Sequence, residues 1–242
     1  VVFFAFQLYL DFSAYSDIAI GAARTLGFNL STNFKRPYLA KSFSDFWNRW
    51  HISLSSWFRD YVYIPLGGNR ATKSKVTRNI LIVFVLSGLW HGASWNFIIW
   101  GGINAVFMLL FDRFLLNKNN NVIKRIFTSI FVFSFWALSL VFFRAETYGD
   151  AIKMVLNLFE SGSEKLYDYG LNSLEFSFAI KLLVGYLVVE LILEKYDNLY
   201  QWFVNRNFVI RWVVYILMVT AILLFGSYGV GLNDNNFIYF QF

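Results

Sequence analysis

The sequence predicts an all-α fold: a polytopic bundle of transmembrane helices, with broken or re-entrant helices around a tunnel and further helices at the membrane interface. Of the 242 residues, 57% are hydrophobic and only 15% are charged, whereas about a quarter of the residues of a soluble domain are charged. Several apolar runs approach the ~20 residues that a helix needs to cross a bilayer. Both histidines of the chain, His51 and His91, lie inside apolar and aromatic stretches.

Composition excludes several classes of protein. The chain has no cysteine, so it forms no disulfide and carries no thiol nucleophile or cysteine-bound metal. Its two histidines show neither an HxxxH nor an HxxE spacing, and we expect no metal site. The net charge of +6 is modest, and its positive residues lie near apolar segments, which suits the anionic headgroups of the cytoplasmic leaflet. Membrane lipid is therefore an expected partner, and nucleic acid is not.

Residues 1–28 are mostly apolar and predict a membrane helix that carries Asp11 and Asp17. Carboxylates at such a depth are costly and usually face the protein interior or a wet cavity, so a buried structural role is favoured for both. The chain starts inside an apolar run, without Met or the basic segment of a signal peptide. We expect residues 1–242 to be one membrane-embedded unit, the C-terminal part of a longer chain.

A polar segment follows residue 28, and Ser42 then opens the next expected helix. The Ser-x-x-Asp pattern of Ser42 and Asp45 is that of a capping box. One continuous helix would place the large residues beyond it on a single face, because they recur at helical spacing: Trp47, Trp50, His51, Leu54, Phe58 and Tyr61. Pro65 and the glycines after it would end this helix.

A short basic segment precedes the next apolar run, and the positive-inside tendency predicts a cytoplasmic loop there. It contains Arg70, Lys73, Lys75 and Arg78. The run from Ile80 to Trp90 covers only about half of a ~30 Å hydrocarbon core, which places His91 near the middle of the membrane. Small residues follow at 92–94, and broken backbone at that depth is tolerated only beside protein or a water-filled cavity. We therefore expect a tunnel or cavity at His91.

The rest of the chain predicts three further spans and one surface helix. The spans are expected over residues 126–143, 176–193 and 213–232. Between the first two, residues 144–159 alternate charged and apolar side chains at helical spacing, which is typical of a helix lying on the membrane surface. Polar residues at 117–125 and 161–174 are expected to form loops.

The two histidines are the first candidates for chemistry, because a buried imidazole favours its neutral form and can take a proton from a hydroxyl near pH 7. A single histidine in a membrane is more often a packing residue. Here His91 lies at the predicted break, and His51 lies among large rings. From the residues alone, a pair of proton-transfer groups and a pair of packing residues are about equally supported.

Two motifs lie around and after His51: Phe43-Ser44-Asp45-Phe46-Trp47-Asn48-Arg49-Trp50-His51-Ile52-Ser53-Leu54-Ser55, then Trp57-Phe58-Arg59-Asp60-Tyr61. Together they resemble the membrane-bound O-acyltransferase (MBOAT) family. Five other stretches are similar to the branch of that family containing the alginate O-acetylation membrane protein: Gly88-Leu89-Trp90-His91-Gly92-Ala93 and residues 7–17, 63–70, 142–145 and 237–242. The resemblance covers essentially the whole chain. The related D-alanyl transferase of teichoic-acid modification shares some motifs but departs where this chain has Ile64-Pro65-Leu66-Gly67-Gly68.

The resemblance implies acyl transfer across a bacterial inner membrane by a multi-pass enzyme with no bound cofactor. The donor would be acetyl-CoA or another acyl thioester from the cytoplasm, and the acceptor a hydroxyl of an extracytoplasmic polysaccharide or of a periplasmic acetyl-acceptor protein. In this interpretation His91 is the base that takes the proton of the acceptor hydroxyl. His51 orients or polarises the donor carbonyl, or shares the proton. The reverse assignment of the two histidines remains open.

Six further residues are candidates for substrate binding: Asn48, Arg49, Arg59, Asp60, Trp90 and Asn96. Arg49 or Arg59 would hold the phosphates of a CoA-like donor, or pair with Asp60. Arginines that flank membrane helices usually anchor them, so a structural role is favoured for these charged residues.

Three alternatives to acetyl transfer remain at this stage. The first is D-alanyl transfer to teichoic acid. The second is a proton-coupled transporter in which His51, His91, Asp11 and Asp17 form a relay. The third is a scaffold without catalytic activity. The acceptor is also open among alginate, another exopolysaccharide, peptidoglycan and a relay protein.

Overall fold

The computed structural model describes residues 1–115, 121–158, 172–196 and 198–226. Every regular element among them is helical, and four helices are long and apolar enough to cross a membrane. This confirms the all-α, membrane-spanning fold class. The described residues fall into two compact units, one within 1–158 and the other within 172–226, and each is described by itself. That the chain forms one membrane-embedded unit stays a prediction.

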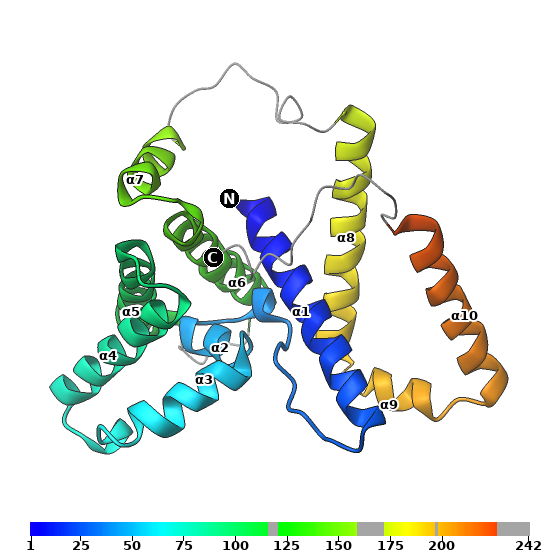
Figure 1. Ribbon diagram of the computed structural model, residues 1–242, viewed down its shortest axis with the longest axis horizontal. Coiled ribbons are helices and arrows are strands. Elements are labelled where there is room, and N and C mark those ends of the chain that lie inside the picture. Colours follow the sequence, from blue (N-terminus) through cyan, green and yellow to red (C-terminus); the bar gives the residue numbers. More distant parts are fainter. Residues whose placement is uncertain (116–120, 159–171, 197, 227–242) are drawn as a thin grey trace. The chain divides into compact units, whose positions relative to one another are not determined.

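The first helix, α1 (Val2–Thr25), packs against α6 (Val122–Arg144) in the first unit (Figure 1). Its buried residues recur at helical spacing and form one face: Ala5, Phe6, Leu8, Tyr9, Phe12 and Ser16. The chain then returns along this face, where the Tyr38 hydroxyl donates a hydrogen bond of 2.5 Å to the carbonyl oxygen of Ala5. Tyr38 belongs to the short 3₁₀ turn η1 (Pro37–Leu39).

The prediction of one continuous helix after Ser42 is wrong. The chain instead forms α2 (Phe43–Trp47), a turn, α3 (Ile52–Phe58) and a π-helical turn, η2 (Arg59–Tyr63). The start is as predicted, since the Ser42 hydroxyl accepts a hydrogen bond of 3.0 Å from the Asp45 N–H. The interruption has a tertiary cause, because two backbone hydrogen bonds, Lys35 N–H to Arg49 and Ile52 N–H to Asn33, tie it to an upstream segment.

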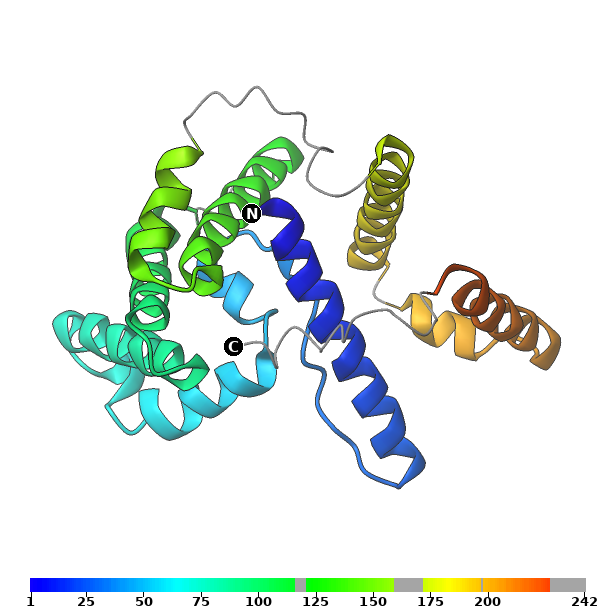
Figure 2. The same ribbon diagram turned by 45° about the horizontal axis from the view of Figure 1, so that its top comes forward.

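Helices α4 (Lys73–His91) and α5 (Trp95–Leu115) follow the 3₁₀ turn η3 (Gly68–Arg70). They form a close antiparallel pair, visible from both directions in Figures 1 and 2. The predicted break directly after His91 is confirmed. The prediction of a basic loop at residues 70–78 is wrong in part, since Lys73, Lys75 and Arg78 already belong to α4. Long basic side chains favour helix, and α4 simply extends through them.

Helix α6 covers the expected span 126–143 and is a few residues longer at its N-terminal end. The predicted surface helix is present as α7 (Tyr148–Asn157), which starts at a Thr147 cap and buries Ala151. Thr147 accepts a hydrogen bond from the Asp150 N–H, which explains why this helix begins later than residue 144. Residues 159 and 117–120 lie outside the described part.

The second unit contains α8 (Ser173–Lys195), α9 (Leu199–Val204) and α10 (Phe208–Phe225). Asn172 and Glu175 form a capping box at the start of α8. Both long helices are candidate spans with almost wholly exposed apolar surfaces, as lipid contact requires. The expected span 176–193 is confirmed in α8. The span 213–232 is confirmed up to Phe225, and residues 227–232 lie outside the described part; α9 was not predicted.

Candidate active site

A cavity of about 500 Å³ brings the two histidines of the chain together. Its walls come from α2, α3, the turn between them, η2 and α4, and Asn69 of η3 and Met108 of α5 contribute one further side chain each. The expectation of a cavity at His91 is therefore confirmed. Its continuation as a tunnel to both sides of the membrane stays a prediction.

His51 lies at the turn between α2 and α3, in the left-handed backbone conformation with φ +43°. Such a conformation is uncommon for a residue with a Cβ and often marks a functional site. Only 8% of His51 is exposed. The plane of the His51 ring is nearly perpendicular to that of the Phe12 ring, and the two ring centroids lie 4.8 Å apart. Among the described residues, nothing forms a hydrogen bond with the buried His51 Nε2 atom.

The other nitrogen of His51 meets a residue that sequence reasoning missed. Its Nδ1 atom lies 3.2 Å from Oδ1 of Asn33. Asn33 belongs to the polar segment between α1 and η1, and its Nδ2 donates a hydrogen bond of 3.1 Å to the Ser16 hydroxyl of α1. No spacing pattern in the sequence connects Asn33 with His51, because the contact depends on how the segment folds back.

His91 is the last residue of α4 and is surrounded by rings from three helices. The ring centroids of Trp90, Trp100 and Phe143 lie 5.0, 5.2 and 5.2 Å from that of His91. The Trp90 ring also lies 6.1 Å from the His51 ring, so this half-exposed indole contacts both histidines. Both imidazoles thus occupy an apolar setting that favours the neutral, proton-accepting form.

The structure places only some of the six candidates for substrate binding at the cavity. Asn48 and Arg59 line the cavity, and Trp90 lies beside both histidines. Arg49 instead pairs with Asp45 at 2.8 Å. Asp60, which is exposed and not part of the lining, pairs with Arg59 at 2.8 Å, and this hydrogen bond holds the pKa of the Asp60 carboxyl below its ordinary value.

Asn96 is buried away from the cavity and has a structural contact. Its Nδ2 donates a hydrogen bond of 2.8 Å to the carbonyl oxygen of Ala145, which joins the start of α5 to the end of α6. Asp11 and Asp17 lie on α1 and do not line the cavity. Among the described residues, no cluster of three His, Asp or Glu side chains could hold a metal ion.

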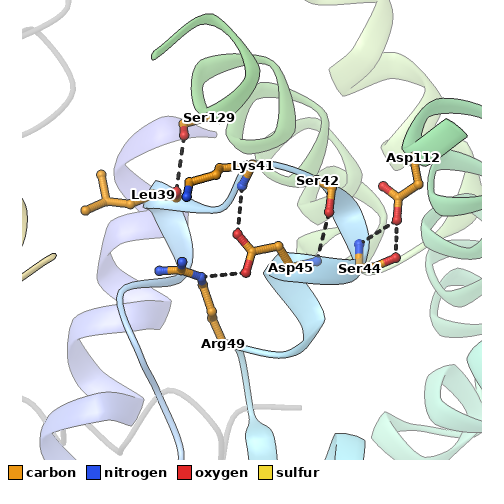
Figure 3. A network of polar contacts seen from close by, with 8 residues as sticks. All are labelled: Leu39, Lys41, Ser42, Ser44, Asp45, Arg49, Asp112 and Ser129. Atoms are coloured by element: carbon orange, nitrogen blue, oxygen red, sulfur yellow. Dashed lines mark hydrogen bonds and ion pairs between the residues drawn. The ribbon is translucent and has the colours of Figure 1, made fainter. Parts of the chain in front are cut away.

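A polar network holds the segment that leads to His51 (Figure 3). The Asp112 carboxylate of α5 accepts hydrogen bonds from the N–H groups of Phe43 and Ser44 and from the Ser44 hydroxyl. Earlier in the same segment, the Leu39 carbonyl accepts a hydrogen bond of 3.2 Å from the Ser129 hydroxyl of α6. The Lys41 N–H donates one of 2.9 Å to the Asp45 carboxylate. The segment before the cavity is thus tied to both α5 and α6.

Comparison with known proteins places this geometry in a family. Residues 1–144, which contain both histidines and the whole cavity lining, match the membrane-bound O-acyltransferase family. The chain belongs to that family. The protein described as "Probable alginate O-acetylase AlgI" from Azotobacter vinelandii is 40% identical to this MBOAT chain over 183 residues, which is 76% of this chain and 36% of the relative.

The names of two other relatives specify different acceptors. The peptidoglycan O-acetyltransferase of Helicobacter pylori is 42% identical over 154 residues, 63% of this chain and 29% of its own. The teichoic acid D-alanyltransferase of Bacillus subtilis is 38% identical over 119 residues, 46% of this chain and 30% of its own. The MBOAT chain described here spans less than two fifths of the length of the alginate O-acetylases that it matches.

Proposed function

We propose that the cavity is the active centre of an O-acyltransferase that moves an acetyl group from a thioester to a hydroxyl. The observation that carries this proposal is that the two histidines of the chain line one cavity. Membership of the MBOAT family supports it, and so do relatives named as an alginate O-acetylase and a peptidoglycan O-acetyltransferase. In this proposal residues 1–242 are the C-terminal, membrane-embedded part of a longer multi-pass protein of the bacterial inner membrane.

The chemistry needs a group that takes up a proton as the new ester bond forms. The acceptor oxygen attacks the thioester carbonyl carbon while its proton passes to a neutral imidazole of the His51–His91 pair. The carbon–sulfur bond then breaks, and the proton leaves the imidazole with the thiolate as a free thiol. General base catalysis of this kind typically contributes about 10²- to 10⁴-fold to the rate.

The lining suggests how the substrates are held. Arg59, together with Asn48, offers polar groups to an anionic thioester such as acetyl-CoA at the cavity wall. The acceptor in this proposal is a hydroxyl of an extracytoplasmic polysaccharide or of a periplasmic acetyl-acceptor protein. Because the relatives' names span several acceptors, the acceptor has to be identified by chemical analysis of the envelope.

The test compares strains that carry the complete protein with His91→Ala or His51→Ala at equal membrane levels. Acetate released by mild base from the purified envelope polysaccharides measures O-acetylation. We expect at least one of the two variants to reduce it by 10²-fold or more. Purified wild-type protein should also transfer label from [¹⁴C]acetyl-CoA, which a transporter or a scaffold would not do. Unchanged acetylation in both variants would refute the proposal.

Chemical analysis tests D-alanyl transfer, and the lining of the cavity bears on the proton relay. Release of D-alanine instead of acetate would identify the alternative that the teichoic acid D-alanyltransferase represents. The proton relay is disfavoured, because no carboxylate occurs among the described residues that line the cavity. A relay would need Asp11 or Asp17 near the histidines, and α1 contributes neither to the lining.

A further inference from the structure

The hydrogen bonds of Asn33 determine which nitrogen of His51 carries the proton. Asn33 Oδ1 accepts hydrogen bonds from the N–H and the hydroxyl of Ser53, at 3.2 and 2.9 Å. A backbone N–H can only donate, so the Asn33 atom that faces Ser53 must be the carbonyl oxygen. The Ser16 hydroxyl lies on the opposite side, where Nδ2 donates to it. The orientation of the Asn33 amide therefore follows from its neighbours.

The same oxygen lies 3.2 Å from His51 Nδ1. An acceptor at this distance requires a proton on Nδ1, because two lone pairs would otherwise face each other. The Ser53 hydroxyl lies closer to Asn33 Oδ1, at 2.9 Å, than to Nδ1, at 3.4 Å, so the shorter hydrogen bond takes its proton and a lone pair faces the ring. A neutral imidazole has a single N–H, so His51 is the Nδ1–H tautomer and its Nε2 carries a lone pair.

This lone pair is buried and has no hydrogen-bond partner among the described residues. His51 is more than nine-tenths buried, lines the cavity and is held by its backbone turn and by Phe12. Buried acceptors without a partner are rare and call for a functional explanation. An acceptor atom fixed beside a cavity suits a ligand that brings a donor, such as a hydroxyl.

We propose that Asn33 is a positioning residue that holds His51 as the Nδ1–H tautomer, so that Nε2 is the atom that accepts the proton of the attacking hydroxyl. The inference rests on the proposed function and reverses the initial assignment of the two histidines. A neutral His51 cannot polarise the donor carbonyl through Nε2, since that atom has no proton to donate. When Nε2 gains the proton, Asn33 Oδ1 keeps its hydrogen bond to Nδ1–H and stabilises the imidazolium.

The first arm of the test reads the tautomer without any assay of activity. The complete protein is labelled with ¹⁵N-histidine, and the signals of His51 are those that disappear in His51→Gln. We expect the Nδ1 signal of a protonated nitrogen and the Nε2 signal of an unprotonated one at neutral pH. In Asn33→Ala the two tautomers should mix. A protonated Nε2 in the wild-type protein would overturn the inference whatever the enzyme does.

The second arm measures transfer of label from [¹⁴C]acetyl-CoA to envelope polysaccharide. Asn33→Ala should lower kcat by about 10²-fold with little change in KM, because the base is misdirected and the donor contacts are intact. Asn33→Asp keeps an acceptor at Nδ1 and should recover most of kcat. Its carboxylate favours the imidazolium, so the acidic limb of the pH–rate profile should move to higher pH. A role in packing alone would not move this limb.

Ser129→Ala is the matched control, since it removes another hydrogen bond of the same segment without touching His51. Its kcat and pH profile should equal those of the wild type. If His51→Ala is inactive while Asn33→Ala is fully active, the inference fails and the proposed function survives. If both histidine variants keep wild-type activity, the proposed function itself fails. An Asn33→Asp enzyme as slow as Asn33→Ala, with no shift of the acidic limb, would also overturn the inference.

Discussion

The Oδ1 atom of Asp112 accepts a hydrogen bond of 2.7 Å from the backbone N–H of Phe43, a residue 69 positions earlier in the chain. Its Oδ2 atom accepts from the N–H and the hydroxyl of Ser44. The first N–H groups of a helix have no partner within the helix, so a carboxylate from α5 here completes the start of α2. Because Ser44 lines the cavity, as does Met108 one helical turn before Asp112, this contact joins two walls of the cavity.

Asp112→Asn is predicted to destabilise the complete protein by about 2 kcal/mol, because the amide accepts with one oxygen only and its NH₂ group faces backbone donors. Asp112 is buried, with 7% exposed, so water cannot replace the lost hydrogen bond. The apparent melting temperature in detergent, followed by tryptophan fluorescence, measures the effect. Asp60→Asn is the control: it breaks an exposed ion pair with Arg59, and loss of such a pair should leave the melting temperature almost unchanged. Equal shifts in the two variants would contradict this account.

Gly101→Ala is predicted to destabilise the α4–α5 pair and to disturb the position of His91. A Cβ atom at Gly101 would overlap the carbonyl oxygen of Phe84 on α4, and backbone atoms cannot move aside as a flexible side chain can. Such overpacking typically costs about 1–3 kcal/mol. The neighbouring Gly102 offers a matched control, because a Cβ there meets no atom within 4 Å.

Gly102→Ala should leave the melting temperature unchanged or raise it slightly, since alanine favours helix by up to ~1 kcal/mol over glycine. The two variants therefore shift the melting temperature in opposite directions or by clearly different amounts. If Gly101→Ala were as stable and as active as Gly102→Ala, the close approach of α4 and α5 would have to be relaxed in the protein.

Local chemistry made part of the site predictable. Small residues at 92–94 interrupt an apolar run, and the structure ends α4 at His91 as that pattern indicates. The Ser42 cap could be predicted from the sequence because the Ser42 hydroxyl and the Asp45 N–H that it caps are only three residues apart. The apolar spans were predictable because the length of a membrane helix is set by the bilayer.

The conformation of His51 was not predictable, because its cause lies elsewhere in the chain. Helical spacing placed His51 on the face of one long helix, but the backbone hydrogen bonds between Asn33 and Ile52 and between Lys35 and Arg49 break that helix. Tertiary contacts often override a weak local preference of this kind. Asn33 and Asp112 escaped notice for the same reason, since each acts on a residue far away in sequence.

Asn96→Ala is predicted to lower stability without changing KM for the donor or the acceptor. The Asn96 amide is 3% exposed and joins α5 to the Ala145 carbonyl after α6, so its loss leaves a buried acceptor without its donor. The expected cost is about 1–3 kcal/mol. Asn48→Ala provides the contrast: Asn48 is exposed and lines the cavity, so KM should rise while the melting temperature stays constant. A raised KM with unchanged stability in Asn96→Ala would restore Asn96 as a substrate-binding residue.

Arg59→Ala is predicted to raise KM for acetyl-CoA by about 3- to 10-fold, with little effect on kcat, because a partly exposed charge-assisted hydrogen bond to a phosphate is lost. Arg59 lines the cavity, whereas its ion-pair partner Asp60 does not. The Asp60 carboxylate accepts a hydrogen bond from Arg59, which lowers its pKa, and it therefore competes with the donor for the guanidinium. Asp60→Asn removes that competition and should leave KM unchanged or lower it.

Salt distinguishes a charge contact from a packing role for Arg59. Raising the NaCl concentration screens exposed charges, so KM of the wild-type protein should rise with salt, and KM of Arg59→Ala should rise less. Two results would show that Arg59 only anchors η2: equal KM increases in Arg59→Ala and Asp60→Asn, or the same salt dependence with and without Arg59. In that case loss of the ion pair itself, and not loss of a donor contact, would explain the change, because both substitutions break the same 2.8 Å interaction.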